Sequence, residues 1–215
     1  MTLYNKKYHY NLDLFYCEDA LSYYLLGAYM TDGCISITKD HSACITLSSK
    51  DRNWLNAVAQ LICPELPIKM HHNHKCWDIK IHSYELAQWF ISKGCTPKKS
   101  LTLKFPDVPN KFIPDFIRGI IDGDGTIILT KFKRKSTNKS TPNKVFTYQK
   151  GQCTLYTASK LFADGFRRTL EQNSFPFSTT QQIPKPSLVR GTEWIIGKAL
   201  VHSTNISGEY ANKFL

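Results

Sequence analysis

The sequence predicts a mixed α+β protein made of two similar halves, each with the order helix, strand, strand, helix, strand, strand, helix. Two observations support this prediction. A nine-residue pattern, which reads apolar, any, Gly, apolar, apolar, any, small, Asp, Gly, occurs at residues 25–33 and again at residues 117–125. Each copy is followed by the same succession of strand-like and helix-like segments. The chain is therefore interpreted as an internal repeat of two αββαββα units.

The composition favours a folded protein with an anionic partner. The chain has 215 residues, and 42% of them are hydrophobic, which is enough for a core. Its formal net charge of +11 indicates a polyanion, and nucleic acid is the commonest one. An anionic membrane is the rival partner, but the sequence has no run of about 18 apolar residues and no isolated basic amphipathic helix. Membrane binding is therefore not expected.

Neither the N-terminus nor the cysteines indicate secretion. Residues 1–10 contain no apolar run before a small-residue cleavage site, and they are poor in Arg and Ser. The seven cysteines are odd in number and include no C-x-x-C pair, which favours reduced thiols and excludes an ordinary zinc ribbon. We expect a protein of a bacterial or phage cytoplasm or of an organelle, not a secreted one.

The first half is predicted to cover residues 1–94. It begins with an aromatic-rich segment, residues 1–17, that we expect to be an extended arm. Helical spacing then predicts a helix that ends at Asp32, where Gly33 would take the left-handed conformation. The other predicted elements are strands 34–38 and 43–47, a helix 52–61 capped by Ser49 or Asp51, strands 68–71 and 76–81, and a helix 84–92 ended by Gly94.

A proline-punctuated connector, residues 95–109, separates the halves, and the second half covers residues 110–215. The order of elements then repeats, with a longer and very basic first hairpin. The predicted elements are a helix from Asn110 or Pro114 to Asp124, strands 126–132 and 145–157, a helix from the cap Ser159 to about Gln172, strands 177–183 and 194–201, and a short last helix within 203–215.

Over residues 18–202 the chain resembles the LAGLIDADG homing endonucleases. The second motif is close to the family pattern, whereas the first has Met30 where an acid is common and Tyr29 in place of an aliphatic residue. Residues 94–103 also resemble the family's linker. The resemblance implies antiparallel sheets that form a DNA-binding saddle, motif helices at the interface between halves, and a monomer. It implies an intron-encoded endonuclease that cuts both strands of a long, asymmetric DNA site.

The resemblance implies that Asp32 and Asp124 are the catalytic and metal-binding acids, with Mg²⁺ as the cofactor. Physical arguments agree with this assignment. Gly27 and Gly119 would let the motif helices approach closely, so that the two acids end near each other. Carboxylates at helix C-termini repel each other and meet the negative end of the dipole, and a hard divalent cation relieves both effects. Such a cation can activate water and stabilise a leaving oxygen.

The resemblance also implies basic and polar groups around each acid. Lys99 in the linker matches a lysine near the scissile phosphate, and Arg52 matches a basic residue one turn into the helix after the second strand. Ser48 occupies the place of a polar, water-positioning residue. In the second half, Lys198 is the candidate counterpart of Lys99.

An alignment of Thr46-Leu47 with Thr154-Leu155 extends these assignments to the second half. It places Tyr156 at the position of the polar residue and Lys160 at the position of the basic residue. Lys160 is therefore the candidate basic residue near the catalytic acid of the second half.

The longer hairpin is the predicted DNA contact. From Gly125 to Ala163 the sequence has no Asp or Glu, but it is rich in Lys and Arg. Basic side chains on a two-stranded ribbon can enter the major groove, neutralise phosphates and read guanine edges. Interleaved Thr, Ser, Asn and Gln side chains can pair with bases. Double-stranded DNA is therefore the expected partner.

Several alternatives stay open. For Asp122, a solvated or helix-end structural role is favoured over a catalytic one. A zinc site at His71, His72, His74 and Cys76 is weaker than a solvent or DNA contact. A dehalogenase-type phosphatase motif at 120–126 lacks downstream acids before Asp164, and an EF-hand lacks its Gly and Glu. The main alternative function is an RNA-splicing maturase or a non-catalytic DNA-binding protein of the same fold, and host intron RNA would then be a partner.

Overall fold

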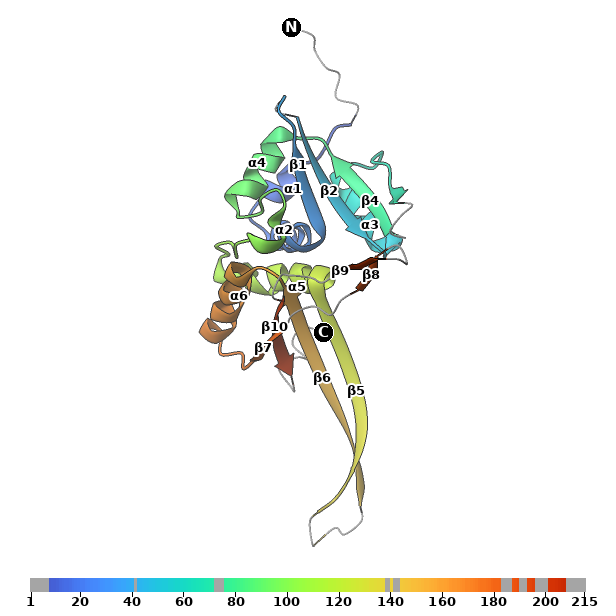
Figure 1. Ribbon diagram of the computed structural model, residues 1–215, viewed down its shortest axis with the longest axis vertical. Coiled ribbons are helices and arrows are strands. Elements are labelled where there is room, and N and C mark those ends of the chain that lie inside the picture. Colours follow the sequence, from blue (N-terminus) through green and yellow to red (C-terminus); the bar gives the residue numbers. More distant parts are fainter. Residues whose placement is uncertain are drawn as a thin grey trace. The chain divides into compact units, whose positions relative to one another are not determined.

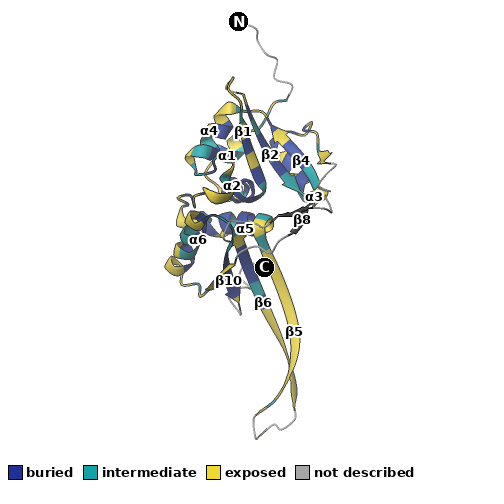
Figure 2. Ribbon diagram, in the orientation of Figure 1, coloured by how far each residue is buried: buried dark blue, intermediate teal, exposed yellow. Residues whose placement is uncertain are grey.

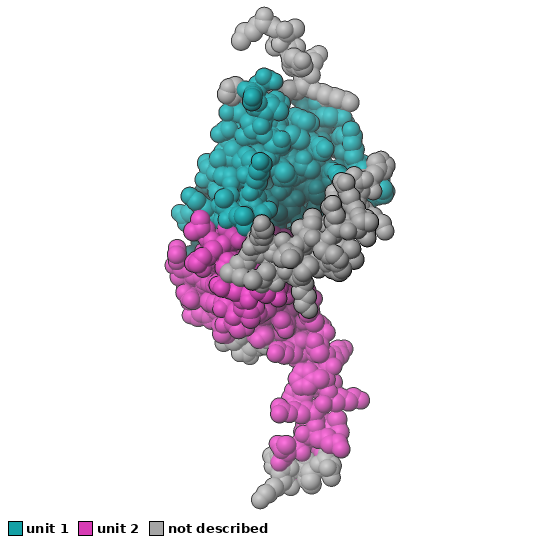
Figure 3. Space-filling model, viewed as in Figure 1, with its two compact units in different colours: residues 1–123 teal, residues 124–215 magenta. Residues whose placement is uncertain are grey.

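The computed structural model describes residues 8–40, 42–71, 76–137, 140, 144–182, 187–189, 193–195 and 201–207. Its contacts divide the chain into two compact units, Met1–Gly123 and Asp124–Leu215 (Figure 3). Each unit contains one four-stranded antiparallel sheet, with several helices against it in the first unit and one described helix, Lys160–Gln172, against it in the second. The mixed α+β prediction is therefore confirmed, whereas the boundaries 1–94, 95–109 and 110–215 stay a prediction about the repeat.

The first unit contains the strands β1 to β4 and most of the helices (Figure 1). Its sheet has the strand order β1-β2-β4-β3, and every pair in it is antiparallel. The bounds are α1 Asp13–Tyr16, α2 Ala20–Asp32, β1 Gly33–Ile37, β2 Ala43–Ser49, α3 Arg52–Ile62, β3 Lys69–His71, β4 Cys76–Ile81, α4 Tyr84–Ser92, the 3-10 turns η1 Lys99–Leu101 and η2 Asn110–Phe112, and α5 Ile113–Asp124.

The second unit repeats this topology with the strand order β5-β6-β10-β7. A separate pair of short strands, β8 and β9, lies between β7 and β10 in the sequence. The bounds are β5 Gly125–Lys135, β6 Val145–Thr157, α6 Lys160–Gln172, β7 Ser178–Gln182, β8 Ser187–Val189, β9 Glu193–Ile195 and β10 Val201–Ser207.

The register of the first hairpin is the same in both units. Gly33 pairs with Leu47 in the first unit, and Gly125 pairs with Leu155 in the second. In each unit the strand begins directly after the motif helix, without a loop. The alignment of Thr46-Leu47 with Thr154-Leu155 is therefore confirmed by the ladders, and the internal repeat extends to individual residue pairs.

Local interactions explain where α2 begins. The backbone N–H of Ser22 donates to the Asp19 carboxylate at 2.7 Å, and the backbone N–H of Asp19 donates back to the Ser22 hydroxyl at 2.9 Å. This reciprocal capping box satisfies two donors that a helix N-terminus otherwise leaves unpaired. From Leu25 to Met30 every residue of α2 is buried, as expected of a helix in the centre of a unit (Figure 2).

Four sequence predictions need correction. Gly33 does not end α2 in the left-handed conformation, because its φ of −83° and ψ of 156° are extended and it starts β1 directly. The expected extended arm contains the short helix α1, since Phe15 is buried against Tyr29 and Phe90, with ring centroids 5.6 Å from each. The expected last helix is wrong over 203–207, which belong to β10, and residues 208–215 lie outside the described part.

The strand predicted at 194–201 also needs correction. Residues 193–195 form the short strand β9, and the partner of β7 is β10 at 201–207. All seven cysteines are free, as predicted, although only Cys63, Cys95 and Cys153 are buried. Within the described ranges, no helix is long and apolar enough to cross a membrane.

Candidate active site

The two motif helices, α2 and α5, touch through their backbones. A Cβ atom on Gly27 would overlap the Phe116 carbonyl and lie 2.9 Å from the Ile120 nitrogen. A Cβ atom on Gly119 would overlap the Tyr24 carbonyl and approach the next turn of α2 as closely. Neither helix backbone can move aside without losing its packing. The prediction that these glycines let the helices approach closely is confirmed.

The C-terminal ends of α2 and α5 also meet. A Cβ atom on Gly123 would lie 2.6 Å from the Thr31 Cβ and 3.5 Å from the Asp32 carboxylate carbon. Asp32 is the last residue of α2 and is half-buried. Asp124 follows Gly123 directly and is the last residue of α5, where its side chain is exposed. Both candidate acids therefore stand at the helix-to-strand junctions of the two motifs.

Lys99 is brought to the same end of α2. Its ammonium donates to the Thr31 carbonyl at 2.6 Å, and its side chain is half-buried. The preceding residue, Lys98, has a φ of 57°, which turns the chain into η1. The carbonyls at a helix C-terminus carry partial negative charge, so a cation is stabilised there. Of the predicted basic site residues, Lys99 thus lies beside the residue that precedes Asp32.

Ser48 lies on β2 at the end of the sheet where β1 follows Asp32, and Arg52 begins α3 after β2. Because Gly33 pairs with Leu47, Ser48 is the next residue along the ladder at this junction. The guanidinium carbon of Arg52 lies 4.6 Å from the centroid of the Trp77 ring, so cation–π contact orients this exposed side chain. Arg52 is therefore held at the first turn of α3, directly after β2.

Asp78 is a polar residue to which the sequence reasoning assigned no role. It lies on β4 opposite Ser48, is only 6% exposed, and accepts a hydrogen bond from the Ser48 hydroxyl at 2.9 Å. In the sequence, Asp78 alternates with apolar residues such as Ile79, which indicates a polar face of the strand. Its pairing with Ser48 could not be predicted, because it depends on the register of β2 and β4. The Ser48 hydroxyl is thus oriented by a carboxylate.

The corresponding position of the second unit is different. Tyr156 is exposed and pairs with Ser203 of β10, where the first unit has Ser48 and Asp78. Lys160 begins α6 as Arg52 begins α3, but its ammonium pairs with Asp164 at 2.5 Å. The hydrogen bond from Lys160 is the main reason that the pKa of the Asp164 carboxyl is lowered. Lys198 lies outside the described residues.

Asp122 takes part in a hydrogen-bonded chain that connects three helices. The Trp54 indole N–H donates to the Tyr24 hydroxyl at 2.6 Å, and this hydroxyl donates to the Asp122 carboxylate at 2.8 Å. Burial, with the Asp122 contact, raises the pKa of Tyr24 to about 12. The contacts join α3, α2 and α5, which agrees with the structural role expected for Asp122.

The candidate metal ligands at these helix ends are carboxylate oxygens, which are hard ligands. In the part of the chain that the structure describes, no group of three or more His, Cys, Asp or Glu side chains could hold a metal ion. Mg²⁺ commonly binds through one or two carboxylates and keeps several waters, which substrate phosphates can replace. Residues 72–75 of the proposed His and Cys cluster lie outside the described residues.

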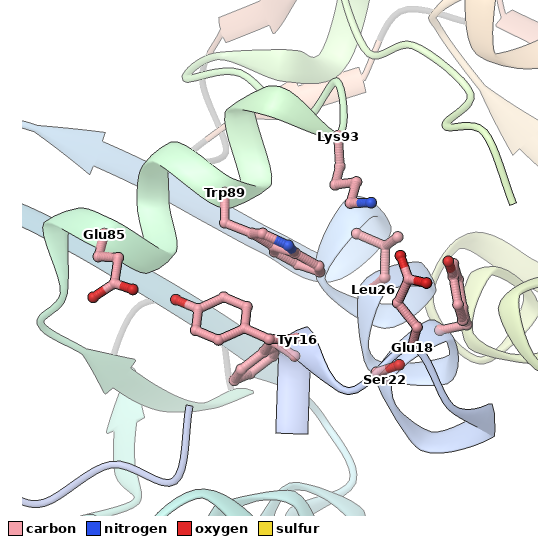
Figure 4. Close-up of a pocket in the computed structure, with 9 residues that line it drawn as sticks. Tyr16, Glu18, Ser22, Leu26, Glu85, Trp89 and Lys93 are labelled. Carbon is pink, nitrogen blue, oxygen red and sulfur yellow. The ribbon is translucent and has the colours of Figure 1, made fainter. Parts of the chain in front are cut away.

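A cavity of the first unit is separate from the acids. It has a volume of about 350 Å³ and lies between α1, α2 and α4. Figure 4 shows Tyr16 and Trp89 at its wall, with Glu18 and Lys93 at one side. The ammonium of Lys93 lies 5.6 Å from the centroid of a Trp89 ring. Neither motif aspartate lines this cavity, so it is not the candidate active site.

The site thus has the geometry of a two-motif α/β protein with an acid at the end of each motif helix. Residues 19–93 match the family model of the LAGLIDADG-like domain. The resemblance to the LAGLIDADG homing endonucleases is therefore confirmed, and the family-model match covers residues 19–93 of the chain. No curated protein sequence matches the chain.

Solved structures of homing endonucleases are similar to this chain. A mesophilic variant of the homing endonuclease I-DmoI has a TM-score of 0.51 and 14% sequence identity, and the match covers 91% of this chain and 92% of that one. An I-DmoI variant in complex with its target DNA and manganese has a TM-score of 0.49 and 14% sequence identity, and the match covers 91% of each chain. The I-LtrWI LAGLIDADG homing endonuclease bound to target DNA has a TM-score of 0.49 and 11% sequence identity, and the match covers 89% of this chain and 79% of that one. The first match shows that the chain has the LAGLIDADG endonuclease fold.

Proposed function

We propose that the protein is a site-specific endonuclease that hydrolyses both strands of a long, asymmetric DNA target. The observation that carries the proposal is the convergence of Asp32, Thr31, Gly123 and Lys99 at the end of α2. A carboxylate and an ammonium at one helix end supply a metal ligand and a phosphate-binding cation. The same junction occurs at Asp124, so each motif contributes one acid, as two-strand cleavage requires.

The proposed cofactor is Mg²⁺, held by Asp32 and Asp124. When bound, such an ion lowers the pKa of a water and stabilises charge on phosphodiester oxygens. The carboxylates supply hard oxygen ligands, and the negative ends of α2 and α5 favour a cation. A third side-chain ligand is not required, because phosphate oxygens and water complete the coordination of this ion.

The other site residues are assigned to the phosphate and the attacking water. The Lys99 ammonium has donors left after its bond to Thr31, and these stabilise negative charge on the scissile phosphate. Arg52, oriented by Trp77, binds a neighbouring phosphate, and Ser48, oriented by Asp78, positions a water. Lys160 is the equivalent of Arg52 in the second unit. Its ammonium pairs with Asp164 and would leave this carboxylate to bind a phosphate.

The basic ribbon β5–β6 is the proposed contact surface for duplex DNA. Lys131, Lys133 and Lys135 lie on one face of the ribbon, because they alternate along β5, and all are exposed. Their ladder neighbours include Gln149 and Thr147, which can hydrogen-bond to base edges. The lysines supply affinity through phosphate contacts, and the polar side chains supply sequence readout.

The test uses a plasmid that carries the DNA flanking the gene, joined as in an allele without the insertion. With Mg²⁺, the wild-type protein is expected to linearise it, and EDTA is expected to stop cleavage. Asp32→Asn and Asp124→Asn should each reduce linear product by about 100-fold or more while DNA binding is retained. The matched control is Asp122→Asn, which removes a carboxylate from α5, the helix that also carries Asp124. Its cleavage rate should be within about threefold of the wild-type rate.

Linearisation by either motif variant at the wild-type rate would disprove the site assignment. Binding of this DNA without any metal-dependent nicking would instead identify a non-catalytic DNA-binding protein. Stimulation of host-intron splicing by the purified protein, without cleavage, would identify a maturase. The proposal also includes a monomeric state and an intron-encoded gene acting in a bacterial, phage or organellar compartment, which light scattering and mapping of the insertion point would test.

A further inference from the structure

The β5–β6 ribbon has two chemically different faces. Beyond the part of β6 that pairs with β10, residues 129–135 and 145–151 form a two-stranded ribbon. Residues that pair across an antiparallel ladder share a face, and alternate residues of one strand do so too. Lys131, Lys133 and Lys135 lie on one face. All the aromatic residues of the ribbon lie on the opposite face, and they are Phe132, Phe146 and Tyr148.

The aromatic face is built as a stack rather than as scattered rings. Phe132 and Tyr148 are a ladder pair, with ring centroids 5.6 Å apart and an interplanar angle of 19°. Phe146 follows on the same face, with its centroid 6.4 Å from that of Tyr148. The three residues are 43%, 37% and 45% exposed for Phe132, Phe146 and Tyr148, respectively. A flat aromatic surface on the ribbon is thus open to solvent.

Basic side chains surround this surface. Arg134 is the ladder partner of Phe146, and Lys150 is the ladder partner of Thr130, so both share the aromatic face. The ammonium of Lys144 lies 5.4 Å from the centroid of the Phe146 ring. No Asp or Glu occurs from Gly125 to Ala163. The rings are therefore bordered by cations that can bind phosphates, and the ribbon has no Asp or Glu that would repel a phosphate.

We infer that the face formed by Phe132, Phe146 and Tyr148 (the aromatic face) binds unpaired nucleobases of a single-stranded nucleic acid, while the lysine face serves duplex DNA. In a duplex the bases stack on each other, and the grooves present only base edges. A stacked ring pair presents a π-surface that needs an unstacked base as its partner. The occupant is thus a single strand whose phosphates meet Arg134, Lys144 and Lys150. This binding does not depend on the proposed cleavage activity.

The same rings also stabilise the ribbon, because a two-stranded hairpin is marginal without cross-strand packing. This structural role fixes the rings in place and does not compete with base stacking on their exposed sides. The two roles make different predictions. A purely structural pair would affect every ligand of the ribbon equally, whereas a stacking surface would affect only ligands with unpaired bases.

The test measures binding of the full-length protein to four labelled 15-nucleotide probes by fluorescence anisotropy. The probes are a single-stranded RNA, a single-stranded DNA of the same sequence, the same DNA backbone with an abasic site at every position, and the DNA duplex. The double variant Phe132→Thr/Tyr148→Thr keeps β-forming residues at both positions and removes the rings. It should weaken binding of intact single strands by about 100-fold, because stacking contributes about 5–150-fold per base. Duplex binding should change by less than about threefold.

The matched control is Leu129→Thr, which removes an exposed apolar side chain from the opposite face of the same strand. It should leave the affinity for every probe within about threefold. The abasic probe carries the same phosphates, so wild-type protein should bind it as weakly as the double variant binds the intact strand. Tighter binding of RNA than of DNA would identify RNA as the ligand, and equal binding would identify any unpaired strand.

A second variant keeps the inference testable where the threonine variant fails to fold. Tyr148→Trp retains the ring, so it should keep single-strand affinity and add tryptophan fluorescence that single strands quench and the duplex does not. The inference is overturned where the abasic and intact probes bind equally. It is also overturned where single-strand and duplex binding fall in parallel, or where the duplex quenches the new tryptophan as strongly as a single strand does.

Discussion

The first hairpins of the two units begin identically and end differently. In both, the strand starts directly after a motif aspartate, and the first glycine pairs with a leucine, Gly33 with Leu47 and Gly125 with Leu155. At the far end the strands are 5 and 7 residues long in the first unit but 11 and 13 in the second. The repeated part is thus the junction that positions the acid. The variable part is the ribbon, which is free to acquire its own binding surface.

The surroundings of the acids differ in the same way. The first unit places Lys99 on the carbonyl before Asp32 and orients Ser48 through Asp78. In the second unit, Tyr156 takes the place of Ser48, and Lys160 pairs with an acid of its own helix. We therefore expect unequal contributions of the two units to catalysis. The variants below test this comparison.

The largest expected effect is on catalysis by the two lysines. Lys99→Met should lower the cleavage rate by about 100-fold, because a donor to the scissile phosphate contributes about 10²–10³-fold. Lys160→Met should cost less, about tenfold, since its exposed ammonium must leave Asp164 to reach a phosphate. Single-turnover cleavage of the plasmid target would measure both rates. Equal losses, or a larger loss for Lys160→Met, would contradict the predicted asymmetry.

The next effect is on stability and should be symmetric. Gly27→Ala and Gly119→Ala each force a methyl group into the backbone of the opposing motif helix. Each should destabilise the protein by about 2 kcal/mol, a fall of about 4–8 °C in the unfolding temperature. Ala57→Gly on the exposed face of α3 is the control, with a cost of about 1 kcal/mol from helix propensity. A neutral Gly119→Ala in calorimetry would show that the helices do not pack as described.

A smaller effect should distinguish the two hairpins in DNA binding. Replacement of Lys131, Lys133 and Lys135 by Gln should weaken duplex binding about tenfold and reduce the slope of log K against log salt by about 2.7. Lys39→Gln, in the turn of the short hairpin, removes one charge and should change the slope by about 0.9 at most. Filter binding between low and moderate salt measures the slopes. An unchanged slope for the triple variant would exclude the ribbon as the phosphate contact.

The smallest effect concerns the hydrogen-bonded chain of the first unit. Tyr24→Phe should cost about 1 kcal/mol at neutral pH, because the Trp54 indole loses its acceptor and Asp122 loses a donor. The raised pKa of Tyr24, about 12, also means that the folded state holds this proton more tightly than the unfolded chain does. Its stabilisation is complete below pH 10 and is lost as pH rises from 10 towards 12.

This prediction is checked by comparing how the stability of the two proteins depends on pH. Thermal unfolding of wild type and Tyr24→Phe, measured from pH 8 to pH 11.5, should show a steeper loss in the wild-type protein above pH 10. The difference is partial, because other groups titrate in the same range. Parallel curves would show that the Tyr24 hydroxyl is not held in this chain.

Much of the fold could be predicted from local patterns. The caps Asp51 and Ser159 and the apolar periodicity of α3 and α6 are local signals, and the structure confirms them. The errors arose where tertiary contacts decide. The helix α1 exists because Phe15 is buried by distant aromatic rings, and a short segment carries no periodicity that would announce this. The extended Gly33 follows from its pairing with Leu47, which helix-ending statistics do not include.

The site shows the same division. The repeated aspartates and glycines could be recognised because both copies have the same spacing. The bond from Lys99 to the Thr31 carbonyl spans many residues and depends on the left-handed turn at Lys98, which sequence patterns do not reveal. The role of Asp78 depended on strand register in the same way. The aromatic face of the ribbon was present in the sequence as alternation, but its orientation needed the β5–β6 ladder.

The absence of a loop between each motif helix and the following strand limits how this chain can change in evolution. An inserted residue after Asp32 or Asp124 would shift the strand by one position and turn each of its side chains to the opposite face of the sheet. Lengthening at the hairpin tip adds ladder pairs without disturbing those already present. Insertions and deletions should therefore be tolerated at the tip of β5–β6, where new contacts with a target can arise, and be eliminated at the two helix–strand junctions.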